Sequence, residues 1–248
     1  MPHPHLLARL QAFRSSAGPV LPCLESLALL VDYGIRGARG ILARSPEDAV
    51  RWAQQLGCPV AMKVESPDIR HRKAANLVRL NVASAEEVRS TFRALMAVAR
   101  QAFPAADIRG ILVQEMIRDG TEVAIGLRHE PPCEPTIWAR PGPDPVGFTE
   151  RLVSRPSPLS RDDAEAMLRE LGRLASPPRD PEELVPDLAA LMGVLLGLSR
   201  LAEDAAGAIA SVDIEPLLVL PADRGAIALG ARAVLREAAA PPATSHNT

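Results

Sequence analysis

The stretch Gly57–Pro67, GCPVAMKVESP, places a single lysine inside a run of apolar, strand-forming residues. Gly57 is a natural end for a preceding helix, and Pro59–Val64 has the composition of a buried strand. Burying a lysine ammonium is costly unless an anionic group meets it. Lys63 is therefore a candidate anion-binding residue, and the alternative is a lysine on a strand edge whose ammonium reaches water.

Outward from this strand, the apolar periodicity alternates between the helical and the extended type. Ser45-Pro46 and Ser84–Glu87 are helix starts, with a capping serine followed by early acidic residues. Helices are expected at Leu24–Tyr33, Ser45–Leu56, Ser84–Phe103, Arg161–Leu174 and Pro181–Glu203. Strands are expected at Gly40–Ala43, Leu77–Val82, Ile111–Met116, Glu122–Leu127, Thr136–Ala139, Ile209–Leu220 and Ala226–Leu229.

Two turn signals predict antiparallel hairpins. Arg118-Asp119-Gly120 separates one pair of predicted strands, and Pro221–Gly225 separates another. Hairpins exclude a purely parallel, doubly wound sheet. The fold class expected from the residues is therefore α+β, or mixed α/β.

Composition excludes several classes of protein. The chain has 248 residues, a formal net charge of -2 and 3% aromatic residues, so neither a basic face nor a set of stacking platforms indicates nucleic-acid binding. No apolar run approaches the roughly 18 residues that span a bilayer, so no membrane association is expected. The three cysteines have neither zinc nor disulfide spacing, and a reducing cytoplasm is the expected location.

Five segments, taken in order, resemble the ATP-grasp domain of ADP-forming acetyl-CoA and acyl-CoA synthetases, of the beta-subunit type. They are Leu29–Ile35 (LLVDYGI), Gly57–Pro67, Ile69–Leu80, Gly110–Met116 (GILVQEM) and Ile209–Leu220 (IASVDIEPLLVL). The resemblance implies two α+β lobes whose antiparallel sheets flank a nucleotide cleft. We expect an N-terminal lobe at residues 21–110 and a C-terminal lobe at 111–237, with a flexible extension at 1–20 and a disordered tail at 238–248.

The resemblance also implies an activity and a partner. Members of this family bind ATP or ADP with Mg²⁺ and transfer a phosphoryl group between the nucleotide and a phosphohistidine of a CoA-binding, alpha-type subunit. A CoA-binding partner in trans, and hence a hetero-oligomer, is expected for this chain. The chemistry is that of phosphoryl transfer, in which positive groups neutralise charge on an in-line phosphoryl group.

Several residues match family positions. Lys63 matches a lysine that contacts the phosphates, and His71 matches a histidine that helps relay the phosphoryl group, although a histidine among basic residues is often only solvated. Glu115 and Met116 would lie on a hinge strand whose backbone faces the adenine. Glu122 matches a glutamate near the nucleotide, or is merely exposed, and Arg79 would pair with Glu122 or with phosphate.

Asp213 and Glu215 are the candidate metal ligands. They alternate along a predicted strand and so point to the same face. Mg²⁺ prefers carboxylate and amide oxygens. The same alternation is equally typical of a solvated strand face.

The chain departs from the family pattern at three places. Asn76-Leu77 stands where paired glycines let backbone amides approach phosphates. Ala139–Gly147 is rich in proline where a glycine-rich stretch and a glutamate are usual. Glu215 replaces an asparagine, and Gly230 stands where an aspartate is usual. The second hypothesis is therefore a degenerate ATP-grasp module without activity that acts as a structural or regulatory partner.

Overall fold

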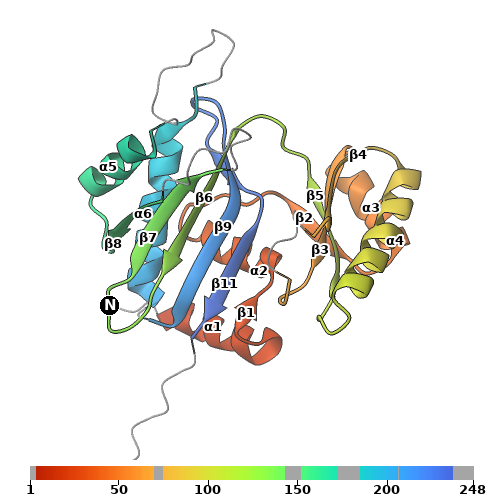
Figure 1. Ribbon diagram of the computed structural model, residues 1–248, viewed down its shortest axis with the longest axis horizontal. Helices are drawn as coiled ribbons and strands as arrows, with labels where there is room; N and C mark the ends of the chain where they lie inside the picture. The colour runs from red at the N-terminus through yellow and green to blue at the C-terminus, as the bar shows by residue number, and fades with distance from the viewer. Residues whose placement is uncertain (1–3, 70–74, 143–151, 173–184, 206, 237–248) are drawn as a thin grey trace, which may run out of the picture.

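The computed structural model of the chain describes residues 4–69, 75–142, 152–172, 185–205 and 207–236. Within these ranges the strands form a smaller and a larger antiparallel sheet, each with helices packed against one face (Figure 1). The smaller sheet has the order β2-β5-β3-β4, with bounds β2 Gly40–Ala43, β5 Gly110–Glu115, β3 Val60–Glu65 and β4 Val78–Val82.

Helices α3 (Pro46–Leu56) and α4 (Ala85–Ala102) cover the side of the smaller sheet that faces away from the larger one (Figure 1). Both begin where the sequence predicts. The Ser45 hydroxyl accepts a hydrogen bond from the Asp48 amide at 3.0 Å, and Ser84 and Glu87 form a reciprocal capping box. These caps satisfy amides that lack partners in the first helical turn.

The larger sheet has the order β1-β11-β9-β6-β7-β8, with β10 paired to β9. Its strands are β1 Val20–Leu21, β6 Thr121–Arg128, β7 Thr136–Pro141, β8 Val153–Pro156, β9 Ile209–Val219, β10 Ala226–Ala228 and β11 Ala231–Leu235. Helices α1 (Pro4–Ala17), α2 (Cys23–Val31), α5 (Arg161–Leu171) and α6 (Leu188–Ala205) complete this half of the molecule. In Figure 1 the sheet lies in front of α1, α2 and α6.

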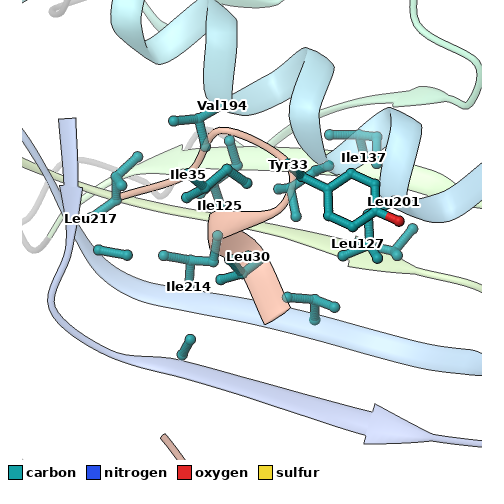
Figure 2. Close-up of a cluster of buried hydrophobic side chains, with 14 of the residues drawn as sticks. Leu30, Tyr33, Ile35, Ile125, Leu127, Ile137, Val194, Leu201, Ile214 and Leu217 are labelled. Atoms are coloured by element: carbon teal, nitrogen blue, oxygen red, sulfur yellow. The ribbon is translucent and has the colours of Figure 1, made fainter. Parts of the chain in front are cut away.

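The main core lies between the larger sheet and its helices. Figure 2 shows Ile125 and Ile214 of the sheet packing toward Leu30 and Val194 of the helices. Because successive residues of a strand point to opposite faces, the intervening side chains of β6 and β9 lie on the other face of the sheet. That face carries the polar residues from which the candidate site is built.

One predicted hairpin is wrong. β5 and β6 belong to different sheets, because β5 pairs with β2 and β3 whereas β6 pairs with β7 and β9. Residues 116–120 therefore connect the two sheets and do not close a hairpin. A turn signal specifies a local bend and says nothing about which strand each flanking segment will pair with. The hairpin between β9 and β10 is confirmed.

The sheets divide the chain differently from the predicted lobes. β5 belongs to the smaller sheet, and Leu21, Leu30 and Ile35 belong to the core of the larger one. Residues 4–17, expected to be a flexible extension, form helix α1. Leu6 and Leu10 anchor that helix, because their spacing of four residues places both on the same side, against the core. The tail predicted at 238–248 lies outside the described residues.

Candidate functional site

Lys63 lies where the two sheets meet. Its strand, β3, pairs on both sides, with β4 and with β5, so the lysine is not on a sheet edge. The side chain is buried, and its ammonium donates to the Gln114 side-chain oxygen at 2.6 Å. It also donates to the main-chain oxygen of Leu229 at 3.0 Å, across the gap to the larger half of the molecule. The Lys63 ammonium thus links the two halves of the molecule at their junction.

Glu115 and Met116 lie at the connection between the sheets, as the hinge prediction requires. The Glu115 carboxylate accepts hydrogen bonds from the backbone amide and from the Nε of Arg39, each at 2.8 Å. An open pocket of about 480 Å³ begins next to this pair. Its lining combines apolar and cationic side chains, from Arg36, Met116, Ile117, Arg118, Asp119, Leu220, Arg224 and Ile227. Such a lining suits a flat apolar group that carries anionic substituents.

Asp213 and Glu215 lie on β9, and each is paired with an arginine from a neighbouring part of the sheet. The Asp213 carboxylate contacts both terminal nitrogens of Arg128, at 2.8 and 3.2 Å. The Glu215 carboxylate accepts a hydrogen bond from Arg140 at 2.6 Å. The Arg128 guanidinium also lies over the Trp138 ring, 6.0 Å from its centre. The carboxylates expected to hold Mg²⁺ therefore already have fixed cationic partners.

The described residues offer two carboxylates, Asp213 and Glu215, as candidate metal ligands, and both are paired with arginines. Within the described part of the chain, no three histidine, cysteine, aspartate or glutamate side chains form a group that could hold a metal ion. Gly230 contributes no side-chain ligand, and a Cβ atom at this position would lie 2.5 Å from the Glu215 carbonyl oxygen. The assignment of Asp213 and Glu215 as metal ligands stays a prediction, and this arrangement does not favour it.

Of the remaining predicted residues, Arg79 lies on the smaller sheet, Glu122 lies on the same face of the larger sheet as Arg128 and Arg140, and His71 is outside the described residues. The Arg79 guanidinium is exposed and donates to the main-chain oxygens of Asn76 and Val78. Glu122 lies on β6, and its main-chain oxygen accepts a hydrogen bond from the Gly142 amide at 2.8 Å. His71 falls within residues 70–74, which the structure does not describe.

Asn76-Leu77 does not obstruct the cleft in the way its sequence position suggests. The Leu77 side chain is fully buried in the core of the smaller half. Asn76 has a φ of +56°, a left-handed conformation that glycine adopts readily and asparagine tolerates better than most residues. The turn therefore keeps a glycine-like backbone without the glycine.

Sequence reasoning missed the two arginines that pair with the carboxylates. A partial signal existed, because Arg128 and Arg140 directly follow the predicted strands Glu122–Leu127 and Thr136–Ala139, and Arg140 alternates with Trp138. The register places Gly126 opposite both Trp138 and Asp213, so all these side chains share one face. The alternation indicates that Trp138 and Arg140 share a face, but the pairing with Asp213 and Glu215 depends on the register between distant strands.

The comparisons with known proteins identify the family of the chain. Residues 12–235 match the family model of the ATP-grasp domain. The chain belongs to this family. It is 31% identical over 212 residues to the beta subunit of the ADP-forming acetate–CoA ligase II of Pyrococcus furiosus, and the match covers 86% of this chain and 90% of that one. The chain is thus homologous to the ATP-grasp beta subunits of ADP-forming acetate–CoA ligases.

Solved structures of the same family share the fold. The acetyl-coenzyme A synthetase 1 of Ca. Korarchaeum cryptofilum, in complex with coenzyme A and Ca-AMPCP, has a TM-score of 0.83 and 30% identity, covering 92% of this chain and 99% of that one. A second structure of that enzyme contains coenzyme A and Mg-AMPPCP, with its phosphohistidine segment pointing towards the nucleotide-binding site. It matches with a TM-score of 0.74 and 27% identity, covering 93% of this chain and all of that one. The predicted ATP-grasp fold is confirmed.

Across the residues described, no helix combines the length and the apolar character needed to cross a membrane.

Proposed function

We propose that this chain is the nucleotide-binding subunit of an ADP-forming acyl-CoA ligase. It exchanges a phosphoryl group between ATP and a phosphohistidine carried by a CoA-binding partner subunit in the cytoplasm. The observation that carries the proposal is Lys63, a buried ammonium at the junction of the two sheets that donates to Gln114 of its own sheet and to the Leu229 carbonyl of the other half. Phosphates entering the cleft would meet a charged donor at this junction, and charge-assisted hydrogen bonds to phosphate are strong.

The pocket beside Met116 supports the same proposal. Apolar side chains of the hinge, of Leu220 just after β9 and of Ile227 on β10 line it, which suits an adenine ring, and its arginines suit phosphate or ribose oxygens. We propose that the phosphates of a nucleotide placed there reach Lys63 of the smaller sheet and the arginines on the open face of the larger one. His71 is proposed to relay the phosphoryl group, as its match to the family motif suggests.

The relatives supply the argument for a partner. The Pyrococcus furiosus homologue is by name one subunit of a ligase. The Korarchaeum enzyme presents its phosphohistidine segment to its own nucleotide site. By analogy, a separate CoA-binding subunit would present the histidine to this chain and would recognise the acyl group.

The test is transfer of label to the partner. The chain is incubated with γ-³²P-labelled ATP and the CoA-binding subunit of the same organism. The expected result is acid-labile, alkali-stable label on the partner, as a phosphohistidine gives, and its loss when Lys63→Met replaces the wild type. Label that persists undiminished with Lys63→Met, or that never forms although nucleotide binds, contradicts the proposal.

A second candidate function is a module without catalytic activity that stabilises or regulates the partner. The pairing of Asp213 and Glu215 with arginines favours it, because these carboxylates are not disposed to hold a catalytic metal. It predicts a stable complex with the CoA-binding subunit and no transfer of label. The same experiment therefore separates the two functions.

A further inference from the structure

Two ion pairs lie side by side on the open face of β9. Arg128, from β6, pairs with Asp213, and Arg140, from β7, pairs with Glu215, with nitrogen–oxygen distances of 2.8 and 2.6 Å. A third arginine, Arg232 of β11, is the register partner of Asp213 on the other side. Three guanidinium groups and two carboxylates thus occupy neighbouring positions across four strands of the sheet.

The charge on this strip opposes a divalent cation. To ligate a metal, Asp213 and Glu215 would have to release their arginines. The guanidinium group of Arg128 would remain on the adjacent strand β6, and that of Arg140 on the next strand, β7. Like charges at such separations repel, and strongly so where solvent is partly excluded. The exposed fraction of the side chain is 24% for Asp213 and 21% for Arg140, so solvent screens the repulsion between these charges only in part.

Gly230 closes off the alternative of a ligand from β11. A side chain at this position would bring its Cβ atom within 2.5 Å of the Glu215 carbonyl oxygen, and the Glu215 amide donates to the Gly230 carbonyl at 2.9 Å. The backbone of the turn is therefore packed against β9 in a way that only glycine permits without a shift.

Guanidinium groups can do part of what a metal does for phosphates. A guanidinium is planar, permanently charged and equipped with several N–H donors, and it binds phosphate oxygens in a fork geometry. Pairing with one carboxylate orients the group without removing its charge or all of its donors. Arg128 is 47% exposed on this face and so remains accessible to a ligand.

We infer that the guanidinium groups of Arg128 and Arg140 take the place of the divalent cation in this site, so that a nucleoside triphosphate binds here without metal. The inference rests on the proposed nucleotide binding and deepens it, because it assigns the phosphate-binding groups. Glu215 and Asp213 act as positioning residues for the two arginines. The nucleotide bound is the free polyanion and not its magnesium complex.

The test is calorimetric titration of the full chain with ATP, once in EDTA and once in excess MgCl₂. The dissociation constant of ATP in EDTA is expected to be no higher than that in magnesium, and the two values should differ by less than about threefold. Arg140→Gln is expected to weaken binding in EDTA by at least about tenfold, and added magnesium should then recover part of the loss, because Glu215 is released from its pair. This appearance of a magnesium response in the variant is a signature that loss of structure alone would not produce.

Arg155→Gln is the matched control. Arg155 lies on β8 and pairs with Glu170 of α5. It is the register partner of the core residue Ile137, so its side chain lies on the face of the sheet opposite to the candidate site. This variant removes one arginine and one ion pair without touching the site, and its affinity should equal that of the wild type. Circular dichroism melting curves establish that each variant is folded.

Three results overturn the inference. Wild-type binding that magnesium tightens more than about tenfold means that a metal site exists, and the proposed function then stands without the inference. Metal-independent binding that Arg140→Gln leaves unchanged removes the arginine from the phosphate site. Absence of binding in both buffers, with the protein folded, overturns the inference together with the proposed nucleotide binding.

Discussion

At the scale of single residues, Lys63 shows how one buried charge can serve both stability and binding. Its ammonium joins Gln114 of the same sheet to the Leu229 carbonyl of the other half of the molecule. Gln114 is almost fully buried, so its side-chain oxygen depends on a protein donor. A substitution at Lys63 therefore has two separable consequences.

Lys63→Met should lower the free energy of unfolding by about 1–3 kcal/mol, because the buried Gln114 oxygen loses its donor. It should also weaken ATP binding by about tenfold or more, the usual scale for losing a charged hydrogen bond. Urea unfolding and calorimetry measure the two effects. The double variant Lys63→Met/Gln114→Leu replaces both partners by apolar groups and should regain stability without regaining binding. Recovery of both together would show that Lys63 acts only through the fold.

The candidate site could be predicted from the sequence only one residue at a time. Lys63 was identifiable because an ammonium in an apolar strand needs an explanation, and Asp213 and Glu215 because alternation places them on one face. Their partners were not identifiable in this way, because Arg128 and Arg140 lie 85 and 75 positions away in the chain. Such pairs depend on the register between strands, which the local sequence does not encode.

At the scale of elements, helix α6 contains two glycines in different surroundings. A Cβ atom at Gly197 would lie 2.5 Å from the Tyr33 carbonyl oxygen, whereas one at Gly193 would meet nothing within 4 Å. Gly197 therefore allows the turn after α2 to approach the helix closely. Gly193 serves no such purpose and only weakens the helix.

Gly197→Ala should destabilise the protein by about 1–3 kcal/mol through this clash, in the range typical of overpacked sites. Gly193→Ala should stabilise it by up to about 1 kcal/mol, the difference in helix propensity between the two residues. Thermal melts of the two variants beside the wild type provide the measurement. Because both changes add the same methyl group to the same helix, equal effects would refute the close approach at Tyr33.

The start of α5 gives a prediction for pH. The Ser160 hydroxyl donates to the Asp163 carboxylate at 2.6 Å, and the Ser160 amide does so at 3.0 Å. These hydrogen bonds hold the pKa of Asp163 below its ordinary value. A lowered pKa in the folded state contributes stability that is present above the unfolded value of about 3.9 and is lost as the pH falls through the folded value.

Ser160→Ala should therefore lower the melting temperature at pH 7, and the gap to the wild type should narrow as the pH falls below about 4, where Asp163 becomes protonated. Melting curves between neutral and acid pH measure the gap. In an Asp163→Asn background the same serine substitution should give a gap that does not change with pH. A gap that widens in acid would mean that the carboxylate is not the group concerned.

The helices and strands that could be predicted from the sequence are those whose ends depend on neighbouring residues. Helices α3 and α4 begin where the sequence predicts because capping is settled within four residues. Strands β1, β8 and β11 and helix α1 were missed, since they are short or lie near the ends of the chain and form through contacts with distant segments. The false hairpin between β5 and β6 has the same origin, because the turn is local and the pairing is not.

At the scale of the whole molecule, a few contacts between the sheets determine whether the two halves act together. Lys63 reaches the Leu229 carbonyl, the Ala38 amide donates to the Ala228 carbonyl at 2.9 Å, and the Glu65 carboxylate reaches helix α2. A nucleotide bound between the halves would contact both, so these links set the geometry that it meets. Glu65 is the link that substitution can probe without altering the proposed phosphate site.

Glu65 lies at the end of β3 and is buried, and its Oε1 accepts the Cys23 amide at 2.9 Å. Cys23 opens α2, so the carboxylate supplies an acceptor to a helix N-terminus that has no capping side chain of its own. Glu65→Ala should lower the free energy of unfolding by about 1–3 kcal/mol, because the amide is left without its acceptor. It should also speed hydrogen exchange in the first turn of α2. Glu65→Gln keeps an acceptor oxygen and should lose less than half as much.

Denaturant unfolding and amide exchange followed by mass spectrometry provide the two measurements. The order expected is wild type, then glutamine, then alanine, with the exchange of the first turn of α2 following the same order. Equal losses for the two variants, with exchange in α2 unchanged, would mean that Glu65 stabilises only its own sheet. The N-terminus of α2 would then be stabilised by the larger half itself, and the contacts of Lys63 and Ala38 would be the links that remain among those named above.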